Sequence, residues 1–150
     1  EILTEAAAVW RCRCERDGVT LMLAEAARSV HLDVDAMRLR QIIDNLMENA
    51  LRVSPQGSQI HLAIHTDAEI ADGSNAVIEV RDSGPGLSEE DLAVAFEPGA
   101  LHERYRGVRP VGTGLGLALV DRLASRMGGA AAVTSSPGVG SSFWIRIPLA

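Results

Sequence analysis

Apolar residues recur along the chain at two different spacings, which predict both helices and strands. Helical spacing predicts three longer helices, over residues 1–16, 36–53 and 115–127. Asp35 is a suitable N-cap for the second of them, and Ser88 for a further short helix that ends at 96–98. Alternating or continuous apolar runs predict strands over residues 19–23, 30–34, 59–66, 76–81, 130–135 and 141–148. Residues 99–111 show no clear period, so we predict a loop there. Loops of this length inside a compact domain are commonly functional.

The predicted helix over residues 36–53 has a polar stripe as well as an apolar one. The polar stripe follows steps of three and four residues and comprises Arg38, Gln41, Asn45, Glu48, Asn49 and Arg52. A solvated helix face is the ordinary explanation of such a stripe. Asparagine, however, is a poor helix former, and lysine or glutamate would serve a solvated face better. The stripe is therefore a candidate site.

A second candidate lies where the predicted strand 76–81 stops. The strand runs into the sequence Asp82-Ser83-Gly84-Pro85-Gly86, in which glycines at alternate positions allow a tight turn and close approach of a flat ligand. An aspartate at a strand end can accept hydrogen bonds from an exocyclic amine such as that of adenine. Guanine presents a carbonyl oxygen at the equivalent position, which a carboxylate would repel. Taken alone, the same pattern also describes an ordinary turn.

A glycine-rich turn, Gly112-Thr113-Gly114-Leu115-Gly116-Leu117, opens the predicted helix over 115–127. Backbone N–H groups and the helix dipole make such a turn an anion site. The segment before it carries Arg104, Arg106 and Arg109, which suit a lid over phosphates. The spacing and the absence of a preceding strand argue against a Rossmann dinucleotide fold. Asn49 offers an amide oxygen suited to Mg²⁺ when phosphate and water oxygens complete the octahedron.

Composition narrows the class of protein. The chain has 150 residues, enough for one domain, and a formal net charge of −6, which argues against a nucleic-acid surface. It has no lysine, which excludes the phosphate-binding loop that requires Lys and the strand lysine of eukaryotic-type kinases. No apolar run is long enough to cross a bilayer, and the chain begins at Glu1 without a secretory leader, as expected of a soluble piece of a longer protein. Cys12 and Cys14 are expected to be free thiols in a reducing compartment.

Five motifs in order resemble the boxes of bacterial sensor histidine kinases, within the wider ATPase superfamily of gyrase, Hsp90 and MutL. They are N-L-M-E-N-A at 45–50, D-S-G-P-G at 82–86, F-E-P at 96–98, G-T-G-L-G-L at 112–117 and G-V-G-S-S-F at 138–143. The resemblance covers nearly the whole chain. It implies an α+β, two-layer α/β sandwich, with a mixed sheet of about five strands and three helices on one face. It also implies one catalytic and ATP-binding domain over 1–150, with an ATP lid at about 97–113.

The resemblance also implies roles for individual residues. Asp82 would bind the adenine amine with support from Ser141 through water, and Asn49 would bind Mg²⁺. Asn45 and Arg52 would contact phosphates or the metal shell, and Glu48 would polarise an incoming histidine or be a solvated carboxylate beside the site. Gly84 and Gly86 would shape the adenine pocket. The phosphates would be wrapped by the backbone of Gly112, Thr113, Gly114, Leu115, Gly116 and Leu117. Which of Arg104, Arg106 and Arg109 meets the γ-phosphate stays open.

Some features depart from the family pattern or are missing. Val53 stands where many members have an aromatic residue, and Gly99 where a second phenylalanine is common. No histidine has the surroundings of a phosphoacceptor, so the expected partners are a separate histidine-bearing dimerisation domain and, indirectly, a response regulator. We expect a cytoplasmic domain, belonging to a membrane-anchored sensor, that itself contacts neither membrane nor nucleic acid. An anti-sigma-type serine kinase, a gyrase-like ATPase and a non-catalytic nucleotide-binding module are the alternatives.

Overall fold

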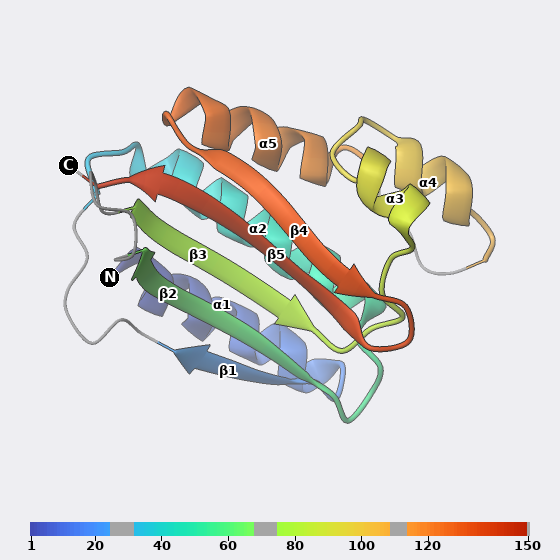
Figure 1. Cartoon of the computed structure of the whole chain (residues 1–150). Coiled ribbons are helices and arrows are strands. Elements are labelled where there is room, and N and C mark those ends of the chain that lie inside the picture. The colour runs from blue at the N-terminus through green and yellow to red at the C-terminus, as the bar shows by residue number, and fades with distance from the viewer. Residues whose placement is uncertain (25–31, 68–74, 109–113, 150) are drawn as a thin grey trace.

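A computed structural model describes residues 1–24, 32–67, 75–108 and 114–149, which form one sheet and five helices (Figure 1). The strands are β1 (Thr20–Ala24), β2 (Gln59–Asp67), β3 (Asn75–Asp82), β4 (Ala130–Ser136) and β5 (Gly140–Pro148). They lie in the order β1-β2-β3-β5-β4. β1 pairs with β2 in parallel and every other described pair is antiparallel, so the sheet is mixed, as the family resemblance implies.

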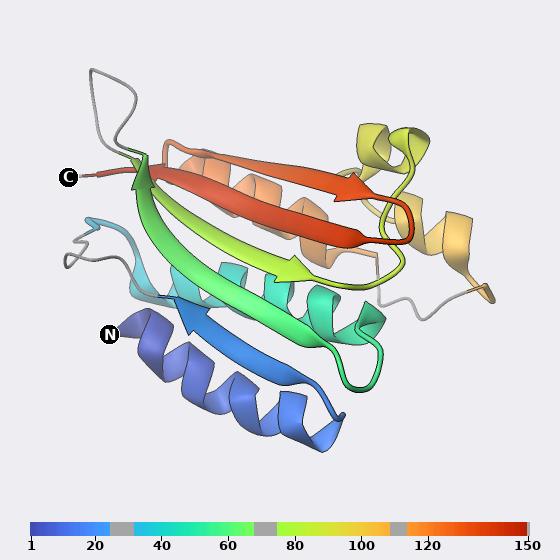
Figure 2. The same ribbon diagram turned by 60° about the horizontal axis from the view of Figure 1, so that its bottom comes forward.

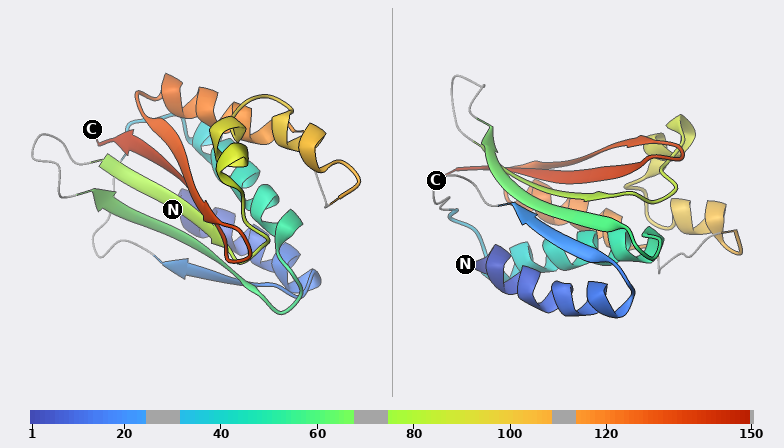
Figure 3. Two further views of the ribbon diagram at one scale, coloured as in Figure 1. Left: turned by 45° about the vertical axis from the view of Figure 1, so that its right-hand side comes forward. Right: turned by 90° about the horizontal axis from the view of Figure 1, so that it is seen from below.

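Three helices form a single layer on one face of the sheet. They are α1 (Ile2–Arg16), α2 (Ala36–Val53) and α5 (Gly116–Arg126), and the views along the sheet show the layer clearly (Figures 2 and 3). α2 lies in the middle, in contact with both α1 and α5. The predicted two-layer sandwich is therefore confirmed. Among the described residues, no helix combines the length and apolar character needed to cross a bilayer.

The core lies between the two layers. Its largest fully buried side chains come from the apolar stripe of α2 and from the inward positions of the strands, among them Ile42, Ile43, Leu46, Met47, Ile60, Leu62, Ile78 and Ile145. Asp35 caps α2, because its side chain accepts hydrogen bonds from the backbone N–H groups of Met37 and Arg38. Trp10 ties α1 to α2 by donating its indole N–H to Asp44 Oδ1 at 2.8 Å. Because the apolar stripe of α2 is buried against the sheet, its polar stripe faces away from the core and is available to form the candidate site.

Two predictions of secondary structure need correction. Residues 32–34 of the predicted strand 30–34 are not in a strand, and residues 30 and 31 lie outside the described residues. Leu32 and Val34 instead pack against the core from the loop that leads into α2, which accounts for their apolar character. The segment 99–111 is not a loop throughout, because Ala100–Tyr105 form a short helix, α4. Helix α3 (Glu89–Val94) begins as predicted, with Ser88 as its N-cap in a capping box with Asp91, but it ends before residues 96–98.

Candidate functional site

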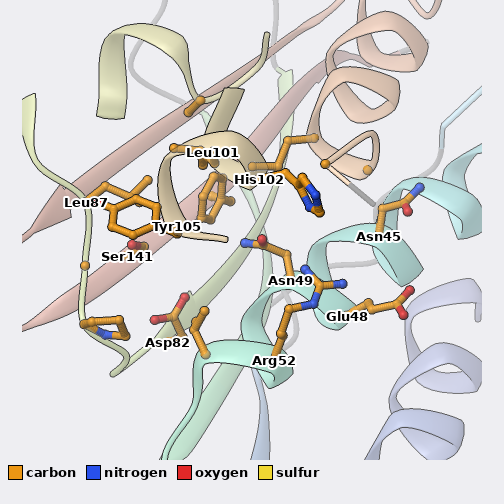
Figure 4. A pocket seen from close by; sticks show the side chains of 18 of the residues that line it. Asn45, Glu48, Asn49, Arg52, Asp82, Leu87, Leu101, His102, Tyr105 and Ser141 are labelled. Carbon is orange, nitrogen blue, oxygen red and sulfur yellow. The ribbon is translucent and has the colours of Figure 1, made fainter. Parts of the chain in front are cut away.

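One cavity gathers most of the predicted site residues (Figure 4). It lies between the polar stripe of α2, the loop after β3, helix α4 and the start of α5. The predicted residues that line it are Asn45, Glu48, Asn49, Arg52, Asp82, Gly86, Gly114, Gly116, Leu117 and Ser141. Residues 45 and 141 are 96 positions apart in sequence, so the fold and not the local chain brings these groups together.

The remaining predicted residues divide into two groups. Gly84, Leu115, Arg104 and Arg106 are described but do not line the cavity. Leu115 is 57% exposed, and Arg104 is ion-paired elsewhere, as described below. The other predicted residues, Arg109, Gly112 and Thr113, lie outside the described residues. Their roles remain predictions.

Asp82 is the most chemically distinctive group in the cavity. It is 4% exposed, and its Oδ1 accepts a hydrogen bond from the Gly84 N–H at 2.8 Å. Its Oδ2 is buried and has no hydrogen-bond partner among the described residues. Burial raises the pKa of the Asp82 carboxyl above its ordinary value, although hydrogen bonds from the backbone N–H groups of Gly84 and Ser141 oppose the rise. A buried carboxylate oxygen without a partner costs free energy, so this oxygen fits a ligand that donates a hydrogen bond to it.

Gly84 contributes to the site although it does not line the cavity. A Cβ at this position would lie 2.8 Å from the Val53 backbone oxygen, 2.9 Å from Val53 Cγ2 and 3.0 Å from Asp82 Oδ1. The loop after β3 can therefore lie against the end of α2 only because residue 84 has no side chain. This close approach sets Asp82 beside the end of the polar stripe.

Ser141 lies beside Asp82 on the next strand, and the Ser135 hydroxyl determines how Ser141 can bond. Ser135 Oγ accepts from the Leu87 N–H at 2.7 Å and donates to the Gly140 carbonyl oxygen at 2.8 Å. A hydroxyl has one hydrogen, and that of Ser135 is used on Gly140. In the 2.8 Å contact between the two hydroxyls, Ser141 must therefore be the donor. Ser141 consequently presents only lone pairs to the cavity, next to the acceptor Oδ2 of Asp82.

The other end of the cavity is formed by the polar stripe of α2. Asn45 Nδ2 donates to the Gln41 backbone oxygen at 3.0 Å, which leaves the amide oxygen of Asn45 for other contacts. Asn49 lies one turn further along, and Figure 4 shows it pointing into the cavity beside Arg52. No cluster of three His, Cys, Asp or Glu side chains suited to a metal occurs among the described residues. A divalent ion here would therefore take the Asn49 oxygen together with oxygens from the ligand and from water, which is the usual Mg²⁺ arrangement.

Much of the cavity wall was not predicted as part of the site. The additional lining residues are Val53, Pro85, Leu87, Ala95, Glu97, Leu101, His102, Tyr105 and Phe143. Phe143 could have been found from the strand alternation, because it faces the same side as Ile145 and Ile147. Leu101, His102 and Tyr105 fall within the lid predicted at about 97–113 but were not named individually, because α4 was not predicted, although Tyr105 lies at helical spacings of four and three residues from the other two.

Asp91 on α3 holds α4 in place. This fully buried carboxylate accepts a hydrogen bond from Tyr105 Oη and forms an ion pair with Arg104 Nε at 2.7 Å from its Oδ1. Its Oδ2 also accepts from the Ser88 N–H at 3.2 Å. Burial alone would raise the pKa of Asp91, but the bonds from Tyr105 and Ser88 and the Arg104 charge outweigh burial, so this pKa is lowered. Asp91 therefore ties Arg104 and Tyr105 of α4 to helix α3.

We expect Asp91→Asn to destabilise the domain by about 2 kcal/mol or more at pH 7, because it weakens several charge-assisted bonds to a buried group. Because folding lowers this pKa, the carboxylate contributes stability above the unfolded aspartate pKa of about 3.9. That contribution is lost as the pH falls through the folded value. Urea unfolding should thus show a difference between the two proteins that shrinks below about pH 4. Glu90→Gln, a change at an exposed position on the same helix, is the control; an Asp91→Asn curve that coincides with it would contradict this role.

The comparisons with known proteins agree with this geometry. A family model described as histidine kinase-, DNA gyrase B-, and HSP90-like ATPase matches residues 34–150, which include the whole cavity lining. The chain belongs to this ATPase family. The resemblance drawn from the sequence motifs is thereby confirmed.

The relatives of this ATPase domain are sensor kinases. The sensor protein TorS of Escherichia coli (strain K12) is 44% identical over 115 residues, which are 77% of this chain and 12% of TorS. The sensor protein GacS of Pseudomonas syringae pv. syringae is 39% identical over 118 residues, 79% of this chain and 13% of GacS. The chain therefore spans about an eighth of the length of these curated relatives.

A solved structure supports the fold. Full-length ShkA in complex with AMPPNP superimposes with a TM-score of 0.81 at 31% identity, covering 99% of this chain and 29% of ShkA. The predicted mixed sheet with its helix layer is thus also found in ShkA. Together with the family match, these relatives identify an ATP-binding catalytic domain of the two-component kinase type.

Proposed function

We propose that this ATPase domain binds Mg-ATP and transfers the γ-phosphate to a histidine on a separate phosphoacceptor domain of a sensor kinase. The observation that carries the proposal is the pairing of two groups in one cavity. The unpartnered Asp82 Oδ2 lies at one end, and the amide side chains of Asn45 and Asn49 lie at the other. The first suits the base of ATP and the second suits its phosphates.

The base end discriminates between purines by hydrogen-bond donors and acceptors. Asp82 Oδ2 and the lone pairs of Ser141 present acceptors only. The 6-amino group of adenine offers two hydrogens to such a surface, directly or through water, whereas a 6-oxo purine offers a repelling oxygen. A buried polar surface of this kind rejects a ligand that leaves it unpaired.

At the phosphate end, Asn49 would hold Mg²⁺, which neutralises the charge on the phosphate oxygens when it is bound. Asn45 and Arg52 line the same stretch of the cavity and would contact phosphate oxygens. The incoming imidazole nitrogen forms a bond to the γ-phosphorus as the bond to the β,γ-bridging oxygen breaks, and ADP leaves. Glu48, which is exposed on the same stripe, would accept a hydrogen bond from the other ring nitrogen and then take its proton.

The acceptor residue separates this proposal from a serine kinase, an ATPase and a non-catalytic module. Gyrase-like relatives place a glutamate, as general base for water, where this chain has Asn45. A histidine acceptor needs less activation than water does, because its nitrogen is already nucleophilic. The partner histidine domain, the response regulator downstream and the cytoplasmic side of a membrane-anchored parent all belong to this proposal.

The proposal is tested by incubating the domain with γ-labelled ATP, Mg²⁺ and the histidine hairpin of its parent protein supplied in trans. We expect label on the hairpin that is labile in acid and stable in base, as a phosphoramidate is. A hairpin with the acceptor histidine changed to glutamine should take up no label. Acid-stable label, or rapid phosphate release without labelling, would favour the serine kinase or the ATPase instead.

A further inference from the structure

Neither lid arginine that the structure describes is directed into the cavity. Arg104 Nε lies 2.7 Å from the buried Asp91 Oδ1, on the side of α4 that faces α3. Arg106 follows the last residue of α4, is exposed, and does not line the cavity. Moving Arg104 to a phosphate would leave the Asp91 carboxylate buried without its charge partner, which is costly.

The residue of α4 that does face the phosphate end is His102. It lines the cavity together with Leu101 and Tyr105. Figure 4 shows its imidazole directed toward the α2 stripe, above Asn49 and on the side of Asn45. The adenine would lie beside Asp82. His102 lies at the opposite end of the cavity, where the phosphates would be.

The backbone around His102 is fixed on two sides. Tyr105, one turn along α4, is held by Asp91. On the other side the Gly99 N–H donates to the Gly114 carbonyl oxygen at 2.8 Å, which joins the start of α4 to the glycine-rich turn. A Cβ on Gly114 would lie 2.8 Å from His102 Cβ, so this glycine allows the turn to pack against the histidine. The backbone that carries the imidazole is therefore held in place on both sides.

We propose that His102 is the residue of α4 that binds the phosphate chain of ATP, a role for which the sequence left Arg104, Arg106 and Arg109 open. The inference rests on the proposed function. An imidazole N–H donates a hydrogen bond to a phosphate oxygen. The other charged groups that line the same cavity are Arg52 and Glu48 on α2, Glu97 before α4, and Asp82 at the far end. Asp91 positions His102 indirectly by binding Tyr105 and Arg104.

The test compares ligands that have the base with and without phosphates. Affinities of ATP, ADP and adenosine are measured by calorimetry with Mg²⁺ for the wild-type domain, His102→Ala and His102→Gln. We expect His102→Ala to weaken ATP about 10-fold to 100-fold, since a hydrogen bond to a charged group is lost. Adenosine affinity should change less than about 2-fold. Glutamine retains an N–H donor and should recover a large part of the ATP affinity. His65→Gln, at an exposed position on β2, is the control and should match the wild type.

Two results would overturn the role of His102. One is unchanged ATP affinity in His102→Ala; the other is an equal loss of ATP and adenosine, which would mean that the histidine only packs the wall. Both leave the proposed function standing, because wild-type ATP binding and transfer to the hairpin are measured separately. A wild-type domain that binds ATP with the expected dependence on His102 but never labels the hairpin would overturn the transfer reaction alone. Thermal unfolding of both variants shows whether the folded state is retained.

Discussion

Changing Asp82 to asparagine is expected to lower the affinity for ATP by about 100-fold or more while leaving the domain folded. The Gly84 N–H donates to Asp82 Oδ1, so in the variant the amide oxygen takes that position. The amide nitrogen then takes the place of Oδ2 and directs N–H groups into the cavity. Adenine would meet a donor instead of an acceptor at its 6-amino group.

The same change should reverse the preference between purines. Hypoxanthine carries an oxygen at the 6-position, which can accept from the new amide. Inosine triphosphate should therefore bind to Asp82→Asn as well as or better than ATP, whereas the wild type should prefer ATP. Calorimetry with both nucleotides measures the reversal, and Asp33→Asn, at an exposed position, is the control. If Asp82→Asn loses affinity for ATP and inosine triphosphate equally, the Asp82 carboxylate does not discriminate between a 6-amino and a 6-oxo purine.

Asp82 also predicts how the stability of the nucleotide-free domain depends on pH. Folding raises the pKa of this carboxyl, chiefly through burial. The folded state therefore binds the proton more tightly than the unfolded state does, and this contribution to stability is complete only below the unfolded pKa of about 3.9. It is lost as the pH rises through the raised folded value. Relative to the wild type, Asp82→Asn should gain stability over that interval, as measured by urea unfolding without nucleotide.

The elements that could be predicted from sequence are those whose signal is local. The buried stripe of α2 follows from apolar spacing, and its cap from Asp35. The pairing of Asp82 with the polar stripe was predicted from motif order, because spacing alone cannot show that residues 49 and 82 share a cavity. The inward side of β5 also follows from simple alternation.

The parts that were not predicted depend on tertiary contacts. Helix α4 has only six residues, too few for a stable isolated helix, and it is held by Asp91 and by the backbone bond between Gly99 and Gly114. The sequence around residues 100–105 does not indicate that Asp91 and Gly114 would bind this segment. The predicted strand 30–34 failed for the opposite reason, because apolar residues can pack against a core from a loop as well as from a sheet.

Changing Asn49 to alanine is expected to abolish the Mg²⁺ dependence of ATP binding and to lower phosphotransfer by about 100-fold or more. Asn49 lines the cavity on the stripe of α2, one turn from Asn45, and is the proposed protein ligand of the ion. Without its amide oxygen the ion keeps only oxygens from the nucleotide and water, so the protein no longer fixes the phosphates relative to the acceptor. Adenosine affinity should be unaffected, since the base end is intact.

The Asn49 experiment needs a variant that changes the same helix without touching the proposed metal site. Arg38→Ala serves, because Arg38 is exposed near the start of α2 and does not line the cavity. ATP is titrated into each protein at several Mg²⁺ concentrations, and transfer to the histidine hairpin is timed in parallel. Wild type and Arg38→Ala should bind ATP more tightly as Mg²⁺ rises, whereas Asn49→Ala should show a flat dependence. A Mg²⁺ dependence in Asn49→Ala that matches the wild type would show that Asn49 is not the protein ligand of the ion.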